Sequence, residues 1–254
     1  MAGLRGCFFL AAAVVLLSLA LASSATDFDF FYHVQQWPGS YCNTKNGCCI
    51  PDGGNPPADF TLHGFWPQYA ACRSALGIDD DDDGLLVVEN AGELERKKKK
   101  KCWPEFCSTE KLSLAQISDL LVDMQLTWPT LSCTNKENLP FWSHEWEKHG
   151  TCSNLGQHTY FQLALQHQAR YNLTAILAGA GIVPSGEATY YLSSIRDAIA
   201  EATGSAPNFA CNRDESGEAQ LLEVYQCLDL TGTRPVNCTL PKSGCTDKVK
   251  FPEV

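Results

Sequence analysis

The chain has 254 residues, of which 19 are Lys or Arg and 29 are Asp or Glu, so its formal net charge is −10 with histidine neutral. An acidic balance of this size argues against a protein that coats nucleic acid nonspecifically, because the binding surface of such a protein is basic. The length suits one domain with a sizeable hydrophobic core.

The N-terminus has the pattern of a secretory signal peptide. Arg5 precedes an apolar run from Cys7 to Ala22 that one serine interrupts, and small residues follow up to Ala25. This pattern predicts cleavage near Ala25. A membrane anchor is the alternative, but the unbroken run is shorter than the roughly 20 residues that span a bilayer. We therefore expect residues 1–25 to be removed, and residues 26–254 to form a secreted or vacuolar domain that does not bind a membrane.

The 13 cysteines favour the same route. Cys7 lies in the predicted signal peptide, and the remaining cysteines suffice for six disulfides in an oxidising compartment. A metal site at Cys48 and Cys49, or at Cys102 and Cys107, is the alternative. These spacings lack the paired Cys-x-x-Cys of common zinc sites, so we expect no metal there.

Two N-glycosylation sequons also agree with a secretory route. They begin at Asn172 and Asn237. Asn237 is followed by a cysteine, and a disulfide there would limit access to the second sequon.

The first part of the mature chain is predicted to form two strands separated by a cysteine-rich loop. Phe28 to Gln36 is aromatic and β-prone, and it runs into the turn at Trp37 to Gly39. Phe60 to Pro67 is the second strand, with His63 in its middle and an end at the proline. A lone histidine in a strand is more often a hydrogen-bonded core residue than a catalytic group, so His63 by itself indicates little.

Residues 73–101 lie between two cysteines and carry blocks of like charge. Asp79 to Asp83 are five aspartates, and Lys97 to Lys101 are five lysines. Such runs are usually solvated, so we predict a surface insertion that Cys72 and Cys102 close off. A nucleic-acid-guiding role for the lysines is the alternative, but the aspartates would cancel much of their field.

The rest of the chain is predicted to alternate between helices and strands. Apolar residues recur at helical spacing in three segments. These are Leu112 to Leu126, His158 to Leu177, and Ser193 to Ala202, which Gly204 closes. Near the last four cysteines, Leu221 to Leu230 and Arg234 to Leu240 have the composition of strands.

The segment from Phe141 to Cys152 contains two histidines, two glutamates, a lysine and two tryptophans. If residues 142–149 form a helix, the step of about 100° per residue places Lys148, Glu145 and His149 within about 140° of His144. One face then carries an acid, a cation and two imidazoles. A purely structural amphipathic helix would place apolar residues on one face and scatter its charges over the other.

A zinc site is the competing enzymatic interpretation of this helix. In the helical zinc pattern, two histidines are four residues apart and share a face. His144 and His149 are five residues apart and would diverge by about 140°. The spacing therefore disfavours zinc, and we expect neither a metal nor another cofactor.

Two segments carry a resemblance to a known family. Phe60 to Pro67 and Phe141 to Cys152 resemble the two active-site segments of the T2 family of ribonucleases, and the surrounding sequence resembles the plant S-like branch. The likeness covers nearly the whole mature chain. It includes Gln35 to Gly39, Cys48-Cys49, Trp128-Pro129 and the four C-terminal cysteines. His33, where an apolar residue is more usual, and the long charged insertion depart from the family pattern. The resemblance implies an α+β fold, a single disulfide-rich domain with an antiparallel β-sheet flanked by helices.

The chemistry of RNA cleavage explains why two histidines would be needed. Attack by the 2′-hydroxyl requires a base for its proton, an acid for the leaving 5′-oxygen, and cations for the charge of the phosphorane. Imidazoles can fill both proton-transfer roles because their pKa lies near 6.5. The resemblance implies His149 as base and His63 as acid. It also implies that His144 holds the phosphate or the 2′-hydroxyl, and that Glu145 and Lys148 stabilise or orient the transition state.

Aromatic residues near the histidines can stack bases without reading a strict sequence. By resemblance, Phe141 and Gln36 are candidates for base contacts and Trp66 for the wall of the site. Ordinary core packing is the alternative for each of them.

The resemblance implies a secreted endoribonuclease of low base specificity. Single-stranded RNA would be cleaved without a metal, through 2′,3′-cyclic phosphates to 3′-phosphates, and DNA would not be cut. We expect a monomer with an acidic pH optimum, because Glu145 and the negative net charge should favour charged histidine. An inactive storage or defence protein of the same fold is the alternative, but such a chain should have lost His63 or His149.

The family pattern also implies how the cysteines pair. Five pairs follow from it: Cys42 with Cys48, Cys49 with Cys133, Cys107 with Cys152, Cys211 with Cys245, and Cys227 with Cys238. Cys72 and Cys102 then remain for a sixth.

Overall fold

The computed structural model describes residues 26–71, 73–74, 100–134, 136–239 and 244–254. The predicted signal peptide and most of the charged insertion lie outside these residues. Within them, every helix is too short or too polar to cross a lipid bilayer.

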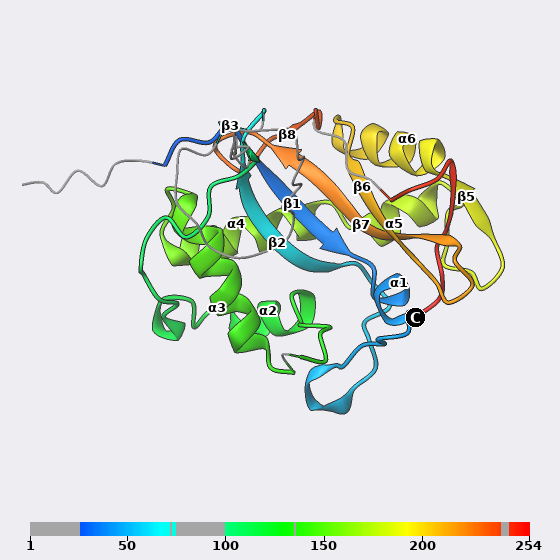
Figure 1. The fold of residues 1–254 in the computed structure, drawn as a ribbon, viewed down its shortest axis with the longest axis horizontal. Helices are drawn as coiled ribbons and strands as arrows, with labels where there is room; N and C mark the ends of the chain where they lie inside the picture. Colours follow the sequence, from blue (N-terminus) through cyan, green and yellow to red (C-terminus); the bar gives the residue numbers. More distant parts are fainter. Residues whose placement is uncertain (1–25, 72, 75–99, 135, 240–243) are drawn as a thin grey trace, which may run out of the picture.

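A mainly antiparallel sheet forms the centre of the fold (Figure 1). Strand β1 (Phe30–Gln36) is buried along its whole length because it lies between β2 (Thr61–Gln68) and β7 (Ala219–Leu228). The other strands of this sheet are β5 (Thr189–Tyr191), β6 (Asn208–Arg213), β8 (Pro235–Val236) and β9 (Lys248–Lys250). The β7–β9 contact is parallel, at Gln220 and Lys250. Strand β2 lies at the edge, where Pro67 is tolerated inside a strand.

Helices cover the sheet and divide its core into two main clusters. The helices are α1 (Pro38–Cys42), α2 (Leu121–Thr127), α3 (Asn138–Lys148), α4 (Gln157–Arg170), α5 (Leu173–Gly179) and α6 (Leu192–Thr203), with short 3₁₀ turns at Pro51–Gly53, Leu114–Gln116 and Gly150–Cys152. Residues of α3 and α4 pack on Phe31 and Phe65 of the sheet. Residues of α5 and α6 pack on Val224 and Phe251. The predicted α+β class, with an antiparallel sheet flanked by helices, is confirmed.

Two predicted helices are shorter than the apolar spacing suggested. The segment Leu112 to Leu126 contains the turn Leu114–Gln116 and all of α2 except its last residue, and Ile117 and Met124 are buried as their spacing predicts. The segment His158 to Leu177 is divided between α4 and α5. Asn172 causes this break, because its side chain accepts a hydrogen bond from the N–H of Ala175 and caps a new helix.

The C-terminal predictions are only partly correct. Helix α6 ends as expected at Gly204, which adopts a left-handed conformation with φ of 77°. The strand expected over Arg234 to Leu240 is limited to β8, since Pro235 has no N–H for a longer ladder, and Leu240 lies outside the described residues.

The ends of the charged insertion lie side by side. Strand β3 (Arg73–Ser74) pairs antiparallel with β4 (Lys100–Lys101). Cys102, which follows β4, is disulfide-bonded, whereas Cys72, its expected partner, lies outside the described residues. The two ends of the 73–101 segment are therefore adjacent, which is compatible with an insertion in a surface loop.

Five disulfides connect described residues, and they are the five pairs that the family pattern implies. They are Cys42–Cys48, Cys49–Cys133, Cys107–Cys152, Cys211–Cys245 and Cys227–Cys238.

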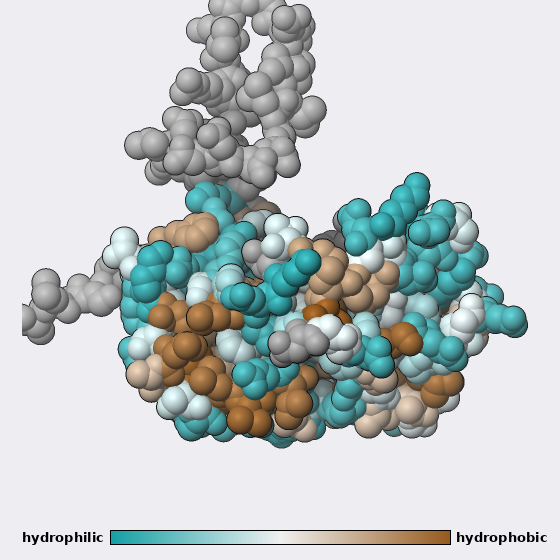
Figure 2. Space-filling view, turned by 90° about the horizontal axis from the view of Figure 1, so that it is seen from below, coloured by the Kyte–Doolittle hydropathy of each residue, from teal (hydrophilic) through white to brown (hydrophobic). Residues whose placement is uncertain are grey.

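Exposed apolar side chains gather on one half of the molecule. Figure 2 shows brown, hydrophobic residues mainly on the half that holds α2 and α3. Val122 and Leu126 on α2 are each 67% exposed, and Leu139 on α3 is also exposed. Val122 and Leu126 lie outside the apolar stripe predicted from helical spacing in this segment, of which Ile117, Leu120 and Met124 are buried.

His33 forms a buried pair with a second histidine. Its ring is fully buried, and Nε2 donates to the carbonyl of Ala164 at 2.9 Å. The ring of His167 lies 4.5 Å away between centroids. Burial lowers the pKa of His33 to about 4, although the bond to Ala164 opposes this. Burial, and then the charge of His33, lower the pKa of His167 to about 2, so both rings are neutral in the folded protein.

This pair should make the fold acid-labile, and replacing it with apolar residues should reduce that lability. Below about pH 6.5, His33 and His167 bind protons in the unfolded chain but stay neutral in the folded chain. The free energy of unfolding therefore falls as the pH falls toward 4. A histidine held neutral costs about 2 kcal/mol at pH 5. The double variant His33→Phe/His167→Met should therefore lose less unfolding free energy between about pH 7 and pH 5 than the parent, as measured by urea titration.

His158, whose side chain is 38% exposed and pairs with Asp119, provides the matched control. His158→Gln should keep the acid lability of the parent. Equal losses in the double variant and the parent would show that the buried pair does not control it.

Candidate active site

A β-bulge places His63 on the same face of the sheet as Trp66. In the β1–β2 ladder, Val34 pairs with Gly64 and Gln35 with Leu62, so His63 is the extra residue. Leu62 and Phe65 consequently both enter the core cluster with α3 and α4, although they are three residues apart. His63 and Trp66 lie on the other face, with their ring centroids 4.9 Å apart. The bulge is supported by Trp128, whose Nε1 donates to the carbonyl of His63 at 2.9 Å.

Trp66 connects this strand to helix α3. Its Nε1 donates to Oε2 of Glu145 at 2.6 Å. Gly64 makes the contact possible, because a Cβ at this position would overlap both the Trp66 indole and the Glu145 carboxylate. The strand and the helix that carry the predicted catalytic groups are therefore in direct contact.

Helix α3 distributes its polar side chains between the interior and solvent. It begins at Asn138, four residues before the predicted start, and ends at Lys148, so His149 is its C-cap. Glu145 is 2% exposed, His144 is exposed, and Lys148 is intermediate. The single polar face expected from helical spacing thus includes one carboxylate that is inside the protein.

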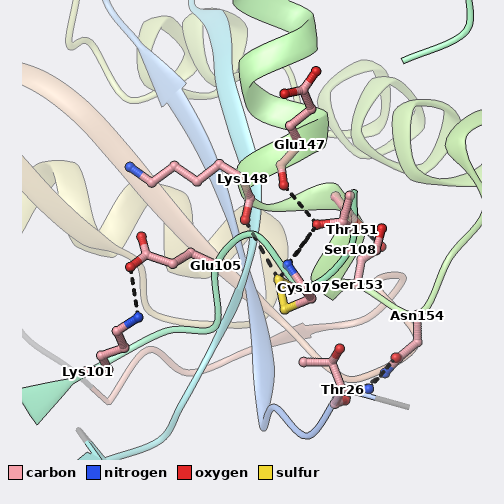
Figure 3. Close-up of a disulfide and its surroundings, with 12 residues drawn as sticks. Thr26, Lys101, Glu105, Cys107, Ser108, Glu147, Lys148, Thr151, Ser153 and Asn154 are labelled. Carbon is pink, nitrogen blue, oxygen red and sulfur yellow. Dashed lines mark hydrogen bonds and ion pairs between the residues drawn. A yellow bond between two sulfur atoms is a disulfide. The ribbon is translucent and has the colours of Figure 1, made fainter. Parts of the chain in front are cut away.

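Hydrogen bonds fix the last turn of α3. The N–H of Phe106 donates to the carbonyl of Lys148 at 2.9 Å. The hydroxyl of Thr151 donates to the carbonyl of Glu147 at 2.8 Å (Figure 3). Carbonyls at a helix end have no partner within the helix, so these bonds satisfy two of them. The backbone leading into His149 is therefore held by residues outside α3.

The same region contains the Cys107–Cys152 disulfide, which links the 102–107 loop to the turn after His149 (Figure 3). Gly150 lies directly against the indole of Trp146, where a side chain would not fit. The turn after His149 is thus fixed covalently on one side and by packing on the other.

His149 also lies against the ring of Trp66. The two rings are stacked, with centroids 5.0 Å apart and planes inclined by 30°. His149 is 7% exposed, and its Nδ1 is buried without a hydrogen-bond partner among the described residues. One indole therefore contacts both His63 and His149, which come from a strand and from a helix end 86 positions later in the chain.

The pKa values of the two histidines are shifted in opposite directions. Burial lowers the pKa of His63, but the hydrogen bond and charge of Glu223 and the charge of Glu145 outweigh it, so that the net shift is upward. Burial also lowers the pKa of His149, and the charges of Lys148 and other nearby cations add to this effect, bringing it to about 2. The protonated form is thus favoured at His63 and the neutral form at His149.

This result corrects one expectation from the sequence. Glu145 and the negative net charge were expected to favour charged histidine; Glu145 does so at His63, whereas the pKa of His149 is lowered. The pKa of His144 is also lowered, first by partial burial and then by the charge of Lys148. Burial raises the pKa of Glu145 itself, against the opposing effects of His63 and the Trp66 hydrogen bond.

The candidate base-binding residues lie near these groups. The ring of Phe141 is 6.1 Å from that of His63. Gln36 is 4% exposed and, on β1, pairs with Thr61 on one side and Glu223 on the other. The Trp66 ring contacts the rings of His63 and His149, and it also joins the packing around Tyr32 and Tyr225.

Sequence reasoning missed one group that touches the site. Glu223 on β7 places Oε1 2.6 Å from Nδ1 of His63. A glutamate inside a strand that is otherwise buried was the available signal, because an ionisable residue at a buried position needs a partner. Across the described residues, no three His, Cys, Asp or Glu side chains are grouped as a metal site.

Several known proteins are similar to this chain in sequence and fold. Ribonuclease 1 of Arabidopsis thaliana is 43% identical over 244 residues, covering 94% of this chain and 93% of that protein. From Solanum lycopersicum, extracellular ribonuclease LE is 41% identical, with 96% of this chain and 95% of that protein covered. Intracellular ribonuclease LX of the same organism is 40% identical, with 94% and 90% covered. The crystal structure of RNase NT in complex with 5′-AMP superposes with a TM-score of 0.74 at 40% identity, covering 90% of this chain and 100% of that one.

The model of the Ribonuclease T2 family matches residues 28–82 and 90–238. This match spans most of the chain, including both segments that meet at Trp66, and the plant relatives align over nearly their full length. The chain therefore belongs to the ribonuclease T2 family.

Proposed function

We propose that this T2-type endoribonuclease cleaves single-stranded RNA by metal-independent transphosphorylation, with His149 as base and His63 as acid. One observation carries the assignment. Two imidazoles contact the same indole, and their pKa values are shifted so that one is neutral while the other is protonated. A base and an acid that must act in one step need this difference.

The reaction proceeds in two steps. In the first, His149 takes the proton of the 2′-hydroxyl, the 2′-oxygen attacks phosphorus, and His63 gives a proton to the 5′-oxygen as the P–O5′ bond breaks. The product is a 2′,3′-cyclic phosphate. In the second step, water replaces the 5′-oxygen and the two histidines exchange roles, which yields a 3′-phosphate.

The surrounding groups support the charge that develops on phosphorus. His144 and Lys148 lie on the accessible side of α3, where they can contact phosphate oxygens. The buried Glu145 orients Trp66 and adds negative potential beside His63. Phe141, Gln36 and Trp66 are the proposed contacts for bases and for the wall of the site.

An inactive storage protein is less well supported, because both histidines and the contacts that position them are present. We further propose that the protein acts as a monomer, enters the secretory pathway after loss of residues 1–25, and carries the 73–101 segment as a dispensable insertion. Asn172 and Asn237 remain proposed glycosylation sites. The side chain of Asn172 also caps α5 and donates to Asp59, so a glycan would have to coexist with these bonds.

Cleavage of a short RNA in EDTA tests the mechanism directly. We expect 2′,3′-cyclic phosphates followed by 3′-phosphates, because imidazoles supply the proton transfers and no metal is required. A DNA of the same sequence, and an RNA with a 2′-O-methyl group at the cleaved nucleotide, should survive because they lack the attacking hydroxyl. Chromatography resolves these products, and loss of cleavage in EDTA would favour a metal enzyme instead.

Single replacements should separate the roles of the three histidines. His63→Phe and His149→Phe should each lose about 10² to 10⁴ in kcat, since each removes one proton-transfer group. His144→Phe should raise KM and lower kcat less, because it removes a contact to the substrate. His158→Gln, far from Trp66, is the control and should retain full turnover. Comparable kcat in His149→Phe and the parent would refute the assignment of the base.

The pH profile should be set by the opposite shifts of the two histidines. As the pH falls, kcat/KM should persist because His149 remains neutral well below its usual range. As the pH rises through the elevated pKa of His63, kcat/KM should decline because the acid loses its proton. Initial rates with a dinucleotide measure this profile, and an alkaline limb that persists in His63→Phe would contradict it.

A further inference from the structure

Glu223 is connected to His63 by a short contact from a neighbouring part of the sheet. The distance from its Oε1 to Nδ1 of His63 is 2.6 Å. Oε2 of the same carboxylate accepts a hydrogen bond from the hydroxyl of Tyr225 at 2.5 Å. The side chain of Glu223 is 11% exposed, whereas that of His63 is 33% exposed. The carboxylate is thus enclosed, while the imidazole reaches the surface of the site.

The sheet itself brings these residues together. His63 is on β2 and Glu223 on β7, and β1 lies between them. Two strand spacings amount to about 9.6 Å, which is too far for side chains that point straight out of the sheet. The bulge at His63 breaks the regular alternation and lets the ring lean toward β7. Gln36 marks this crossing point, because it pairs with Glu223 on one side and with Thr61 on the other.

Hydrogen-bond chemistry decides which nitrogen of His63 carries out the reaction. A carboxylate only accepts, so the proton in this contact lies on Nδ1. Burial, followed by the charge and hydrogen bond of Glu223, raises the pKa of Tyr225, so its hydroxyl keeps the proton that it donates to Glu223. With Oε2 held by Tyr225 and Oε1 by His63, the carboxylate is fixed at both ends. Nε2 is then the ring atom left to exchange protons with a substrate.

We propose that Glu223 is a positioning residue of the transphosphorylation reaction: its carboxylate fixes Nδ1–H of His63 and leaves Nε2 to deliver a proton to the leaving 5′-oxygen. This inference rests on the proposed function, in which His63 is the acid. When His63 gives up its Nε2 proton, the N–H at Nδ1 stays in place and Glu223 remains ionised. The group therefore acts through His63 and does not touch the substrate.

Other charged groups near His63 also shift its pKa. Glu145 on α3 favours the protonated ring, and Lys148 on α3 opposes it. Glu223 contributes both a hydrogen bond and a charge, and each exceeds the effect of Glu145. Removing only the charge of Glu223 is therefore the most selective way to change the acid without altering the rest of the site.

The test compares Glu223→Gln with the parent protein in two independent measurements. Gln has nearly the same volume and can still accept from Nδ1–H, but it carries no charge. By ¹⁵N NMR titration, the pKa of His63 should fall by about one unit, which corresponds to a tenfold change in its charged-to-neutral ratio. In kinetics, the alkaline limb of kcat/KM should shift to lower pH by the same amount. At neutral pH, kcat should fall about tenfold with KM nearly unchanged.

Two further variants distinguish positioning from general structural damage. Glu223→Asp keeps the charge that Glu223→Gln loses. Its alkaline limb should therefore lie closer to that of the parent than its kcat does, because a shorter side chain holds the ring less well. Glu218→Gln, just before β7, removes a carboxylate that pairs with Lys250 and should leave both the limb and kcat unchanged. Circular dichroism and thermal unfolding serve to check that each variant is folded.

The two measurements also separate this inference from the proposed function. If the parent cleaved no RNA, the proposed function would fail, while the NMR titration would still report whether Glu223 controls His63. If the parent were active but Glu223→Gln kept the parental pKa of His63 and the parental alkaline limb, the positioning role would be wrong. A large rise in KM with an unchanged limb would also overturn it, since that pattern indicates a substrate contact.

Discussion

The hydrogen bond from Trp66 to Glu145 is the contact on which the active site depends. It joins the edge strand β2, which carries His63, to helix α3, which ends at Lys148 next to His149. The indole contacts both imidazoles, so it sets their separation as well as their orientation. Gly64 is required for the same reason, because any side chain there would displace the ring or the carboxylate. Trp66, Glu145 and Gly64 thus form one structural unit, although Glu145 is far from the other two in the sequence.

Burial alone does not explain the difference between the two histidines. It lowers the pKa of both, and only their partners differ. His63 faces carboxylates on β7 and α3, whereas His149 faces cations, chiefly Lys148 beside it in the chain. Glu223 on the sheet therefore raises the pKa of His63, the proposed acid, whereas Lys148 at the helix end lowers the pKa of His149, the proposed base. The proposed reaction needs one charged and one neutral imidazole, and different neighbouring charges can produce both states at two buried positions of one site.

Local sequence and the family resemblance indicated the two segments that meet at Trp66, but not the contacts between them. The cluster in residues 141–152 and the histidine in residues 60–67 were apparent from side-chain chemistry and from the family resemblance. The bulge at His63 could not be foreseen, because it depends on how β1 and β2 align. Glu223 was missed because it comes from a strand 160 positions away from His63. Apolar spacing located buried positions such as Ile117 correctly, yet it could not show that Asn172 would end one helix and cap the next.

The Cys107–Cys152 bond gives the enzyme a dependence on its redox surroundings. The loop that it holds supplies the N–H that closes α3 at Lys148, while β2 has no comparable crosslink among the described residues. In a compartment that keeps thiols reduced, the loop would be free to leave, and the order of the backbone at His149 would decline before that of the sheet. His63, the proposed acid, would keep its position in the sheet, while His149, the proposed base, would lose this support. The order of the backbone at His149 thus depends on the oxidised state of one cysteine pair.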